Sequence, residues 1–555
     1  MNFPGPLFPD DEELRSFVKN LLDKVERQSV EIERLKKENE ILRAEIRHLK
    51  KQKGQPVLRA NVKHEPDELS DGENSVADET AQPDKTAPPK NKRPQKHNIG
   101  ETAAPPMTVD REVVCSVEHT GESWRFKGYT NYHHTDLELK FITTCYRREY
   151  YQTPEGSVTA PLPESVRGRY GDNLKVHLID LYHSCSTTQP LLLSWLHSHG
   201  CSISEGALSN ILTQGHEVFH EEKESLLEAG LSCSTYLQTD DTGARHQGEN
   251  GYCLFVGNNH FSYFSSSNSK SRVNFLSKLL GSQPRYILDD TAFGYMEQVK
   301  LPQKWITALR SANGRYFTDL KAWKNLLKEL GVSSPEYCRK ATEGALKAAL
   351  VDRFKLDNLI IHSDGARQFD TAFKRSLCWY HAGRNLDKLI PESDRERVLR
   401  DQAVDRYWNL YDDIEAYKQS PSEEQQKKIR QDFDEWVTEP MAYPELQSVL
   451  GQLMVVKEEL LLVLKYPWLP LHNNLSERQI REYVKRRKVS GGTRSELGRR
   501  CRDTFASLKK TCKQHKISFV HYLKDRLTGL NSIPRLSELI MSAAASQNQS
   551  LAGKI

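Results

Sequence analysis

The stretch Leu471-His-Asn-Asn-Leu-Ser-Glu-Arg-Gln-Ile-Arg481 is the point from which the fold of this 555-residue chain can be inferred. Its asparagines predict a helix that starts at Asn473 or Asn474, and Glu477 falls in the first turn of that helix. One interpretation is purely structural: Asn474 caps the helix and Glu477, three residues later, completes a capping box. The other is that Glu477 belongs to a group of acidic residues that the fold gathers at one site.

Two upstream aspartates support the second interpretation, because each follows a strand-like run. Asp240 lies in Tyr-Leu-Gln-Thr-Asp-Asp-Thr-Gly, and Asp364 lies in Leu-Ile-Ile-His-Ser-Asp-Gly. Two strand-end aspartates and a helix glutamate are what a fold needs to hold two divalent metal ions close together. Asp241 should point away from Asp240, since neighbouring strand residues face opposite sides, so it is the second choice for the first acid.

Four motifs in this order resemble those of the insertion-sequence 66 family of bacterial DDE transposases. They are Asp-Asp-Thr-Gly, Ser-Asp-Gly, Cys378-Trp-Tyr-His-Ala-Gly-Arg384, and the Asn-Asn-Leu-Ser-Glu-Arg-Gln-Ile-Arg string. The resemblance spans roughly residues 165 to 525. Its most specific part is Asn-Asn-x-x-Glu-Arg-x-x-Arg, followed by the basic, glycine-containing segment Arg486-Arg-Lys-Val-Ser-Gly-Gly492.

The resemblance implies an α/β fold: a ribonuclease-H-like catalytic core with helical insertions, preceded by a helical module. It also implies that Asp240, Asp364 and Glu477 are the catalytic, metal-binding acids. Magnesium prefers hard oxygen ligands and retains several waters, so a few carboxylates suffice. We expect Asp240 to bridge two Mg²⁺ ions, Asp364 to hold one and Glu477 the other, with Mn²⁺ able to substitute.

The distribution of charge predicts contact with DNA better than the net charge of +4 does. Between Arg481 and Lys516 there are thirteen lysines and arginines against three acidic residues. Such a segment next to a metal site is typical of binding to the phosphate backbone, although a solvated helix face would look similar. The candidate phosphate or substrate contacts are His381, Arg384, Arg478, Arg481, Arg486, Arg487 and Lys488.

Residues 14 to 49 carry an unbroken heptad pattern. Valine and isoleucine at one core position with leucine at the other favour a two-stranded parallel coiled coil, and a single core asparagine fixes its register. The alternative is a long amphipathic helix packed on its own domain. The predicted dimerisation residues are Val18, Leu21, Val25, Ile32, Leu35, Asn39, Leu42, Ile46 and Leu49.

The predicted organisation has five parts. Residues 1–50 form the coiled-coil dimerisation helix, and residues 51–110 form a disordered linker that is rich in proline and charge. Residues 111–230 form a small DNA-binding module, with strand-like pieces at 113–117 and 139–143 and then helices with helix-turn-helix spacing. Residues 231–525 form the catalytic core, with an insertion at about 282–355 and a last strand at 376–381. Residues 526–555 form a C-terminal tail.

Composition limits the classes of protein that fit. The chain is 37% hydrophobic and 28% charged, and no run approaches eighteen apolar residues, so we expect neither a membrane span nor a signal peptide. Ten scattered cysteines without a Cys-x-x-Cys pair indicate a reducing compartment and give no basis for a zinc site. The predicted location is the bacterial cytoplasm, in association with the nucleoid.

The sequence therefore predicts a DNA transposase that binds the terminal inverted repeats of an insertion sequence, cuts them and joins them to target DNA. Self-association through the coiled coil is expected, and accessory proteins of the same element are possible partners. One alternative is a catalytically silent, dimeric DNA-binding regulator derived from a transposase, against which the intact triad argues. Another is a glycosidase with two acids, which would leave the third acid and the basic segment unexplained.

Overall fold

The structure, a computed structural model, describes residues 109, 111–115, 129–371 and 373–552. The chain divides into two compact units: Met1–Gly54 with Lys140–Ile555, and Gln55–Leu139. The described residues of the second unit contain no helix or strand. The predicted coiled coil with its dimerisation residues, and nearly all of the predicted linker, lie outside the described residues.

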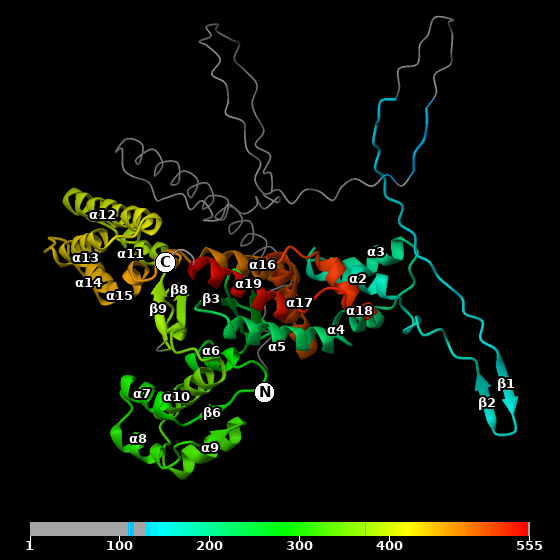
Figure 1. Cartoon of the computed structure of the whole chain (residues 1–555), viewed down its shortest axis with the longest axis horizontal. Helices are drawn as coiled ribbons and strands as arrows, with labels where there is room; N and C mark the ends of the chain where they lie inside the picture. Colours follow the sequence, from blue (N-terminus) through cyan, green and yellow to red (C-terminus); the bar gives the residue numbers. More distant parts are fainter. Residues whose placement is uncertain (1–108, 110, 116–128, 372, 553–555) are drawn as a thin grey trace, which may run out of the picture. The chain divides into compact units, whose positions relative to one another are not determined.

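The first unit is a mixed α/β structure built on a five-stranded sheet with the order β5-β4-β3-β8-β9 (Figure 1). Strands β3, β4 and β5 are antiparallel neighbours, whereas β8 and β9 run parallel to β3. Their bounds are Tyr236–Gly243 for β3, Tyr252–Gly257 for β4, Ser262–Ser267 for β5, Ile360–Ser363 for β8 and Lys374–Leu377 for β9.

Both faces of the sheet are buried, and β4 shows how the sequence achieves this. Its successive residues are all apolar, and alternate side chains point to opposite faces. Leu254 and Val256 join the large core of the unit. Cys253 and Phe255 join a smaller cluster with Ile480 of the helix α16 (Asn474–Ser490). This smaller cluster holds α16, which carries Glu477, against the sheet.

The outer edge of the sheet is covered by the helix α17 (Glu496–Gln514) rather than by another strand. The outward backbone N–H groups of β5 donate to α17 side chains: Ser262 to Thr511 Oγ1 at 3.1 Å, Phe264 to Ser507 Oγ at 2.9 Å and Ser266 to Asp503 Oδ2 at 2.6 Å. The three acceptors are spaced four residues apart, so they lie in one row along the helix. Polar side chains of α17 thus complete the hydrogen bonding of the β5 edge.

Helices predicted between residues 170 and 230 are confirmed. They are α2 (Asp172–His183), α3 (Gln189–Ser198), α4 (Glu205–Thr213) and α5 (Glu217–Ser232). The strand predicted at 139–143 is wrong, because Ile142 is 85% exposed and that segment pairs with no described strand. The hairpin in this region is instead formed by β1 (Tyr150–Thr153) and β2 (Gly156–Thr159).

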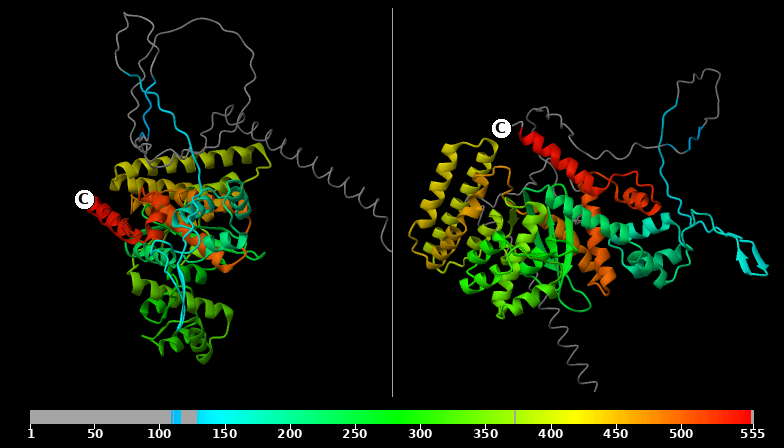
Figure 2. Two further views of the ribbon diagram at one scale, coloured as in Figure 1. Left: turned by 90° about the vertical axis from the view of Figure 1, so that its right-hand side faces the viewer. Right: turned by 60° about the horizontal axis from the view of Figure 1, so that its bottom comes forward.

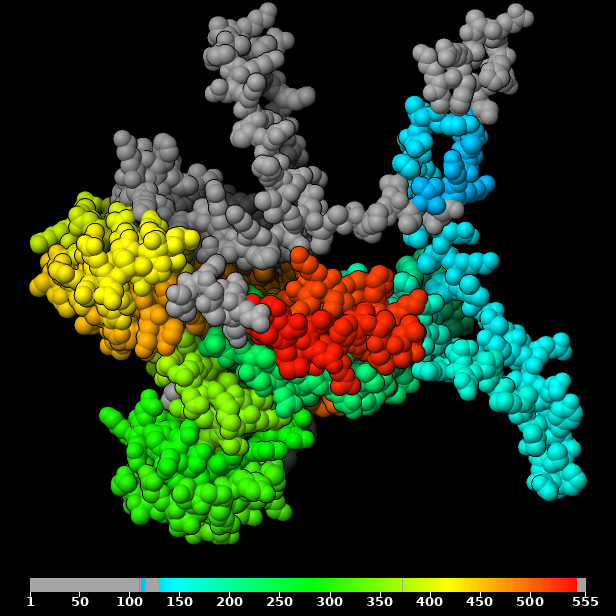
Figure 3. Space-filling model, viewed as in Figure 1, coloured from blue at the N-terminus to red at the C-terminus, as the bar shows by residue number. Residues whose placement is uncertain are grey.

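The segment at 282–355 is largely helical and forms a lobe in the space-filling view, coloured green (Figure 3). It follows α6 (Arg272–Leu279) and its buried side chains, such as Leu346 of α10, belong to the same hydrophobic core as those of β3 and α5. Its elements are β6 (Tyr286–Ile287), α7 (Asp290–Gln298), α8 (Gln303–Arg310), β7 (Tyr316–Phe317), α9 (Leu320–Glu329) and α10 (Pro335–Phe354).

After β8 the chain forms the short helix η1 (Arg367–Phe369) and then β9. The strand predicted at 376–381 is wrong in its second half, since the helix α11 begins at Trp379. Trp379 leaves the sheet because its backbone N–H donates to the Leu471 carbonyl at 2.9 Å and its indole donates to the Leu460 carbonyl at 2.9 Å.

Helices α11 to α15 surround Trp379 with aromatic side chains, including Tyr407 and Trp436, and form a second hydrophobic cluster. They gather beside β9 at one end of the sheet, as two further views show (Figure 2). Their bounds are Trp379–Asp387 for α11, Asp394–Gln419 for α12, Glu423–Thr438 for α13, Pro444–Val455 for α14 and Lys457–Leu460 for α15, which η2 (Leu461–Leu464) follows.

The end of the chain is also helical, with α18 (Phe519–Thr528) after α17 and α19 (Leu536–Ala552) after that. Leu536 and Ile540 are fully buried in the main core, where α19 packs against α5. Residues 526–555, predicted as a tail, therefore contain a helix that completes the core. This helix was not predicted, because few large apolar residues occur in this part of the sequence.

Candidate active site

The two aspartates belong to neighbouring parallel strands: Asp240 lies within β3, and Asp364 directly follows β8. The register pairs Tyr236 with Ile360 and Gln238 with His362. Two further residues along each strand bring Asp240 opposite Asp364, and adjacent strands are only about 4.8 Å apart. Both carboxylates are half-buried. Residues 124 positions apart in the sequence are thus brought together by strand pairing alone.

Asn473 attaches the start of α16 to β3 next to Asp240. Its side-chain Nδ2 donates to the carbonyl of Thr239 at 3.1 Å, and the residue is completely buried. Its backbone N–H faces the Cys378 sulfur at 3.4 Å. Asn473 is the residue that precedes α16, yet its side chain makes no capping hydrogen bond. The capping-box interpretation is therefore wrong: Asn474, the predicted cap, is the first residue of the helix, and Asn473 in the cap position uses its amide to bind the sheet.

Glu477 lies in the first turn of α16 and faces the start of α11. Its Oε1 is 3.7 Å from His381 Nδ1, which is longer than a hydrogen bond. The Glu477 side chain is 33% exposed, so solvent reaches it. Burial lowers the pKa of His381, while the carboxylate of Glu477 opposes that shift. All four sequence motifs therefore meet where β3, β8, α11 and α16 come together.

Asp240 lies among other carboxylates. Burial, reinforced by the carboxylate of Asp364, raises the pKa of Asp240 to about 7. Asp241 and Glu477 contribute in the same direction, and only the hydrogen bond from the Asp241 backbone N–H opposes them. A cation in this place would relieve the repulsion between the carboxylates.

Asp241 differs from Asp240 in having its own partners. Its carboxylate pairs with Lys270 Nζ at 2.6 Å and accepts a hydrogen bond from Gln368 Nε2 at 2.5 Å. These contacts lie on one face of β3. The helix α16 lies on the opposite face, where its Arg487 donates to Thr242 Oγ1. The alternation predicted for the two aspartates thus leaves Asp240 on the face that Glu477 shares.

The carboxylates suit a divalent metal ion for two reasons: their oxygens are hard donors, and a cation would relieve the repulsion between them. They do not form a ready-made cage, since no group of three or more His, Cys, Asp or Glu side chains in the described residues is arranged to hold a metal ion. Asp240 and Asp364 accept hydrogen bonds from backbone N–H groups only, namely those of Asp241 and Ala366. Oxygen atoms of both side chains are thus available to a hard cation.

Comparison with known proteins agrees with this arrangement. A family model described as "Transposase IS66 family" matches residues 344–500, which include Asp364, His381 and Glu477. A relative from Sinorhizobium fredii, whose printed name is "Uncharacterized protein y4jO", is 36% identical over 323 residues, which is 58% of this chain and all of the relative. The chain belongs to the IS66 transposase family.

Membership of the IS66 family indicates a transposase, for which DNA is the implied partner and a divalent metal the cofactor that DDE transposases generally use. The matched segment begins in α10 and ends in α17, so Asp240 lies outside it. The pairing of β3 with β8 connects Asp240 to the matched part. No helix in the described part of this IS66 protein is long and apolar enough to cross a membrane.

Four of the basic side chains on α16 form one exposed row. Arg478, Arg481, Lys485 and Lys488 are spaced three or four residues apart and all are exposed. We call these residues the basic row of α16. It begins one residue after Glu477, and Arg384 of α11 is exposed as well. In this IS66 protein the predicted contacts at Arg384, Arg478, Arg481 and Lys488 are thus on the surface.

Two predicted phosphate contacts lie elsewhere. Arg486 is only 6% exposed and its guanidinium lies 4.1 Å from the ring centre of Tyr182, so it cannot contact DNA on the outer surface of α16. Arg487 donates to the carbonyl of Gly243 and to Thr242 Oγ1, which joins the end of α16 to β3. This difference cannot be inferred from the basic run itself, because burial depends on residues that lie far away in the chain.

The glycine at position 492, just after α16, is explained by a close backbone contact. A Cβ atom on Gly492 would lie 2.5 Å from the carbonyl oxygen of Arg245, which is closer than real contacts allow. The next residue, Thr493, donates its backbone N–H to that same carbonyl at 2.9 Å. The most specific part of the IS66 resemblance therefore joins α16 to β3 at its start, through Asn473, and to the loop after β3 at its end.

Proposed function

We propose that this protein is the DNA transposase of an insertion sequence and that Asp240, Asp364 and Glu477 carry metal-dependent strand cleavage and strand transfer. The observation that carries the proposal is the convergence of the three acids. Asp240 lies within β3, Asp364 directly follows the neighbouring parallel strand β8, and Glu477 lies in the first turn of a helix that Asn473 attaches beside Asp240. Family membership supports the same reaction class.

The sheet supports a ribonuclease-H-like core as the finer description of the fold. Three antiparallel strands, connected in sequence, lie beside two parallel strands, with the acids at the junction between the two sets. In open α/β sheets, ligands bind beyond the carboxyl ends of the strands where the order of connection reverses. Asp240 and Asp364 lie at such a point.

The residues have distinct parts in the proposed reaction. Bound Mg²⁺, for which Mn²⁺ can substitute, would supply an activated water and stabilise the leaving oxygen of the phosphodiester. Asp240, Asp364 and Glu477 would hold the metal, with Asp240 between the other two. Asn473 fixes α16, and therefore Glu477, against β3. His381, 3.7 Å from Glu477, is placed to contact the scissile phosphate.

DNA would lie along the basic row of α16, next to Glu477. Lysine and arginine contacts of this kind bind phosphates without reading sequence, and they position the duplex over the acids. Recognition of the terminal repeats then belongs to other parts of the chain, for which the helices α3 and α4 are candidates. Self-association through residues 1–50 would bring two such sites to paired element ends.

Cleavage of labelled element-end DNA by the purified protein in Mg²⁺ tests the proposal. We expect nicking by the unchanged protein and a loss of several orders of magnitude in Asp240→Asn, Asp364→Asn and Glu477→Gln, with DNA binding and thermal stability retained. Combining two of these changes should cost no more than one, because the groups act as a unit.

Asp241→Asn is the matched control, since it removes the neighbouring carboxylate that pairs with Lys270. It should retain cleavage close to that of the unchanged protein. Near-normal nicking by Glu477→Gln would refute the triad. DNA binding without any metal-dependent nicking by the unchanged protein would favour the alternative of a silent regulator.

A further inference from the structure

A pocket lies behind α16, on the side away from Glu477. Its lining includes Gln479, Glu482, Tyr483 and Arg486, which are three or four residues apart and therefore share one face of the helix. Arg486 is nine residues after Glu477, or about two and a half turns, so the two side chains leave the helix on opposite sides. We call this cavity the rear pocket.

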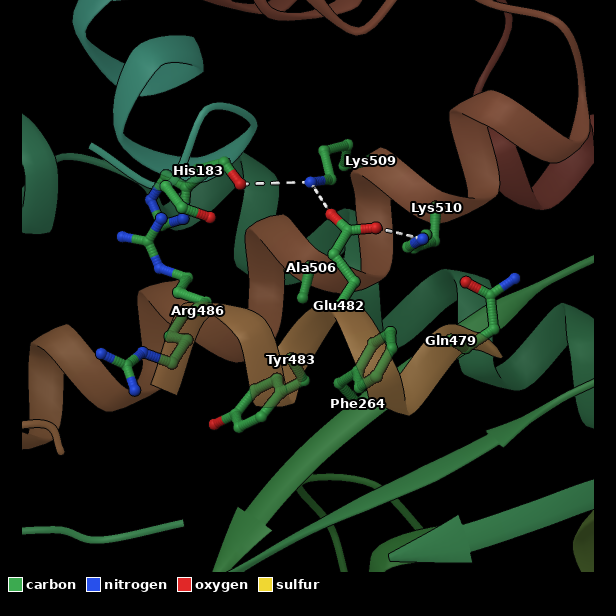
Figure 4. Close-up of a pocket in the computed structure, with 11 residues that line it drawn as sticks. His183, Phe264, Gln479, Glu482, Tyr483, Arg486, Ala506, Lys509 and Lys510 are labelled. Carbon is green, nitrogen blue, oxygen red and sulfur yellow. Dashed lines mark hydrogen bonds and ion pairs between the residues drawn. The ribbon is translucent and has the colours of Figure 1, made fainter. Parts of the chain in front are cut away.

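The charged side chains that line the rear pocket are mostly cations. Residues of α17 and the end of α2 complete it, and its empty space is about 390 Å³ including the open mouth (Figure 4). The charged and titratable groups that line it are His183, Glu482, Arg486, Arg502, Lys509 and Lys510. Burial, with Arg486 next in effect, lowers the pKa of His183 far below its usual value, so this imidazole is neutral. Four cations therefore face one carboxylate.

Glu482 does not neutralise this excess, because it is already used by the lysines. Lys509 and Lys510 both pair with it, and Lys509 also donates to the carbonyl of His183 at 3.1 Å (Figure 4). The two arginines are left without a carboxylate. Arg502 donates to the hydroxyl of Ser490 at 3.0 Å, which is a neutral acceptor.

Arg486 is the group that points to a ligand. It is 94% buried, and its Nε and NH1 atoms have no hydrogen-bond partner. The aromatic face of Tyr182 lies 4.1 Å from its guanidinium, and no acid among the described residues forms an ion pair with it. A buried guanidinium with unused donors is costly, and a planar fork of donors matches the oxygens of a phosphate or carboxylate.

We propose that the rear pocket binds a single phosphate group, held by the free donors of Arg486 and by Arg502, Lys509 and Lys510. The proposal rests on the proposed function in one respect, because a protein that binds DNA along α16 has the DNA backbone as one source of the phosphate group. The other source is free inorganic phosphate. In either case the bound anion joins α2, α16 and α17, and so steadies the helix that carries Glu477.

Titration of the full-length protein with inorganic phosphate tests the site, in metal-free buffer and at constant ionic strength set with chloride. We expect a saturable rise in melting temperature and saturable heat on titration. Arg486→Lys keeps a charge but loses the fork, and should weaken phosphate binding about tenfold or more. Lys509→Gln is a second variant, for use where Arg486→Lys folds poorly by circular dichroism, and it should also weaken phosphate binding.

Lys524→Gln is the control, because it removes an exposed charge on α18 outside the pocket. It should bind phosphate like the unchanged protein. The absence of saturable stabilisation relative to chloride would overturn the proposal. An equal loss of binding in Lys509→Gln and Lys524→Gln would do so too, since it would indicate general screening of positive charge.

A duplex distinguishes the two sources of phosphate. Should the group belong to DNA, duplex will displace inorganic phosphate, and Lys509→Gln, which removes a charge, will reduce the salt dependence of duplex binding by about one unit of slope. Should free phosphate be the ligand, the duplex will bind without displacing it. Asp240→Asn must keep phosphate binding in both cases, so a failure of the rear pocket and a failure of the catalytic proposal are separable.

Discussion

At the level of single residues, one amide connects the two halves of the candidate site. Asn473 donates to the carbonyl of the residue before Asp240, and Glu477 follows it by four positions. An error of about 1 Å in the position of a reacting group can reduce a rate about a hundredfold. Asn473 is therefore a positioning residue in the proposed reaction rather than a metal ligand.

Asn473→Ala should reduce the rate of Mg²⁺-dependent cleavage by roughly ten- to a hundredfold, because Glu477 loses its fixed distance from Asp240. The free energy of unfolding should fall by only about 1–3 kcal/mol, the cost of leaving the buried Thr239 carbonyl without its donor. Single-turnover cleavage and denaturant unfolding measure the two effects.

Asn258→Ala provides the comparison for that prediction. Asn258 is also buried, and its Nδ2 donates to Ser234 Oγ at 2.8 Å, close to the start of β3 and far along the strand from Asp240. This variant should lose similar stability and keep its cleavage rate. Equal loss of cleavage in the two variants would mean that Asn473 acts through general stability alone.

At the level of helices and strands, the sequence predicted the elements whose pattern is local. The strands that carry or precede Asp240 and Asp364 follow from short apolar runs, and the helices of 170–230 follow from their periodicity, although β3 continues past the end predicted at Asp240 to Gly243. The helix at Trp379 was missed because Leu377-Cys-Trp-Tyr380 is apolar and aromatic, a composition that also suits a strand. Its distant contact with Leu471 decides the outcome.

The same limit applies to the site. The acids of the triad could be named because they occur in motifs, but the sheet contact of Asn473 and the burial of Arg486 could not. The basic run Lys485-Arg-Arg-Lys488 contains two exposed lysines and, between them, two arginines that are buried or half-buried. Tertiary contacts separate them, because Arg486 packs on Tyr182 of α2 and Arg487 binds the end of β3. From the sequence alone, all four basic residues would be assigned as surface charges.

Another element, the predicted coiled coil, can be tested without knowledge of its structure. Removal of residues 1–50 should leave a folded protein with fewer chains per particle in solution, because the heptad residues that would pair two copies are gone. Pairing of two element ends should weaken at the same time, since the effective concentration of the second site falls. Sedimentation equilibrium of the two proteins measures the mass.

A change in two core residues offers a milder version of that test. Leu21→Ser with Leu35→Ser keeps the chain length and removes the apolar seam, whereas an exchange at Lys24 leaves the seam intact. Unequal masses are expected for the first variant and equal masses for the second, relative to the unchanged protein. An equal number of chains per particle in the full-length and shortened proteins would refute the coiled-coil prediction.

For the molecule as a whole, buried histidines give the stability a definite dependence on pH. Burial lowers the pKa of His220 to about 4, and Arg500, His216 and Lys223 act in the same direction while Glu217 opposes them. Between about pH 4 and 6.5 the unfolded chain therefore binds a proton that the folded protein does not. Stability must rise with pH across this range, and it levels off above it.

We expect the free energy of unfolding to fall by up to roughly 3 kcal/mol from this one group as the pH drops through that range. His220→Gln should show a shallower dependence, although it loses the 2.8 Å hydrogen bond to Thr504 and so starts from a lower stability. Chemical denaturation at several pH values gives the slopes. His521→Gln, at an exposed position of α18, is the control, and a slope unchanged in His220→Gln would contradict the assignment.

The way in which α17 covers β5 has a consequence for biosynthesis. The edge strand ends at Ser267, but the side chains that satisfy its N–H groups begin at Asp503, 236 residues later. At about 5–20 residues per second, the ribosome needs on the order of ten to fifty seconds to supply them. During that time the nascent chain presents an open, uncharged strand edge, Ser-Tyr-Phe-Ser-Ser-Ser, to other chains. Prematurely terminated products that end before α17 would keep that edge permanently, and so would be substrates for chaperones and proteases rather than inactive but folded competitors of the full-length protein.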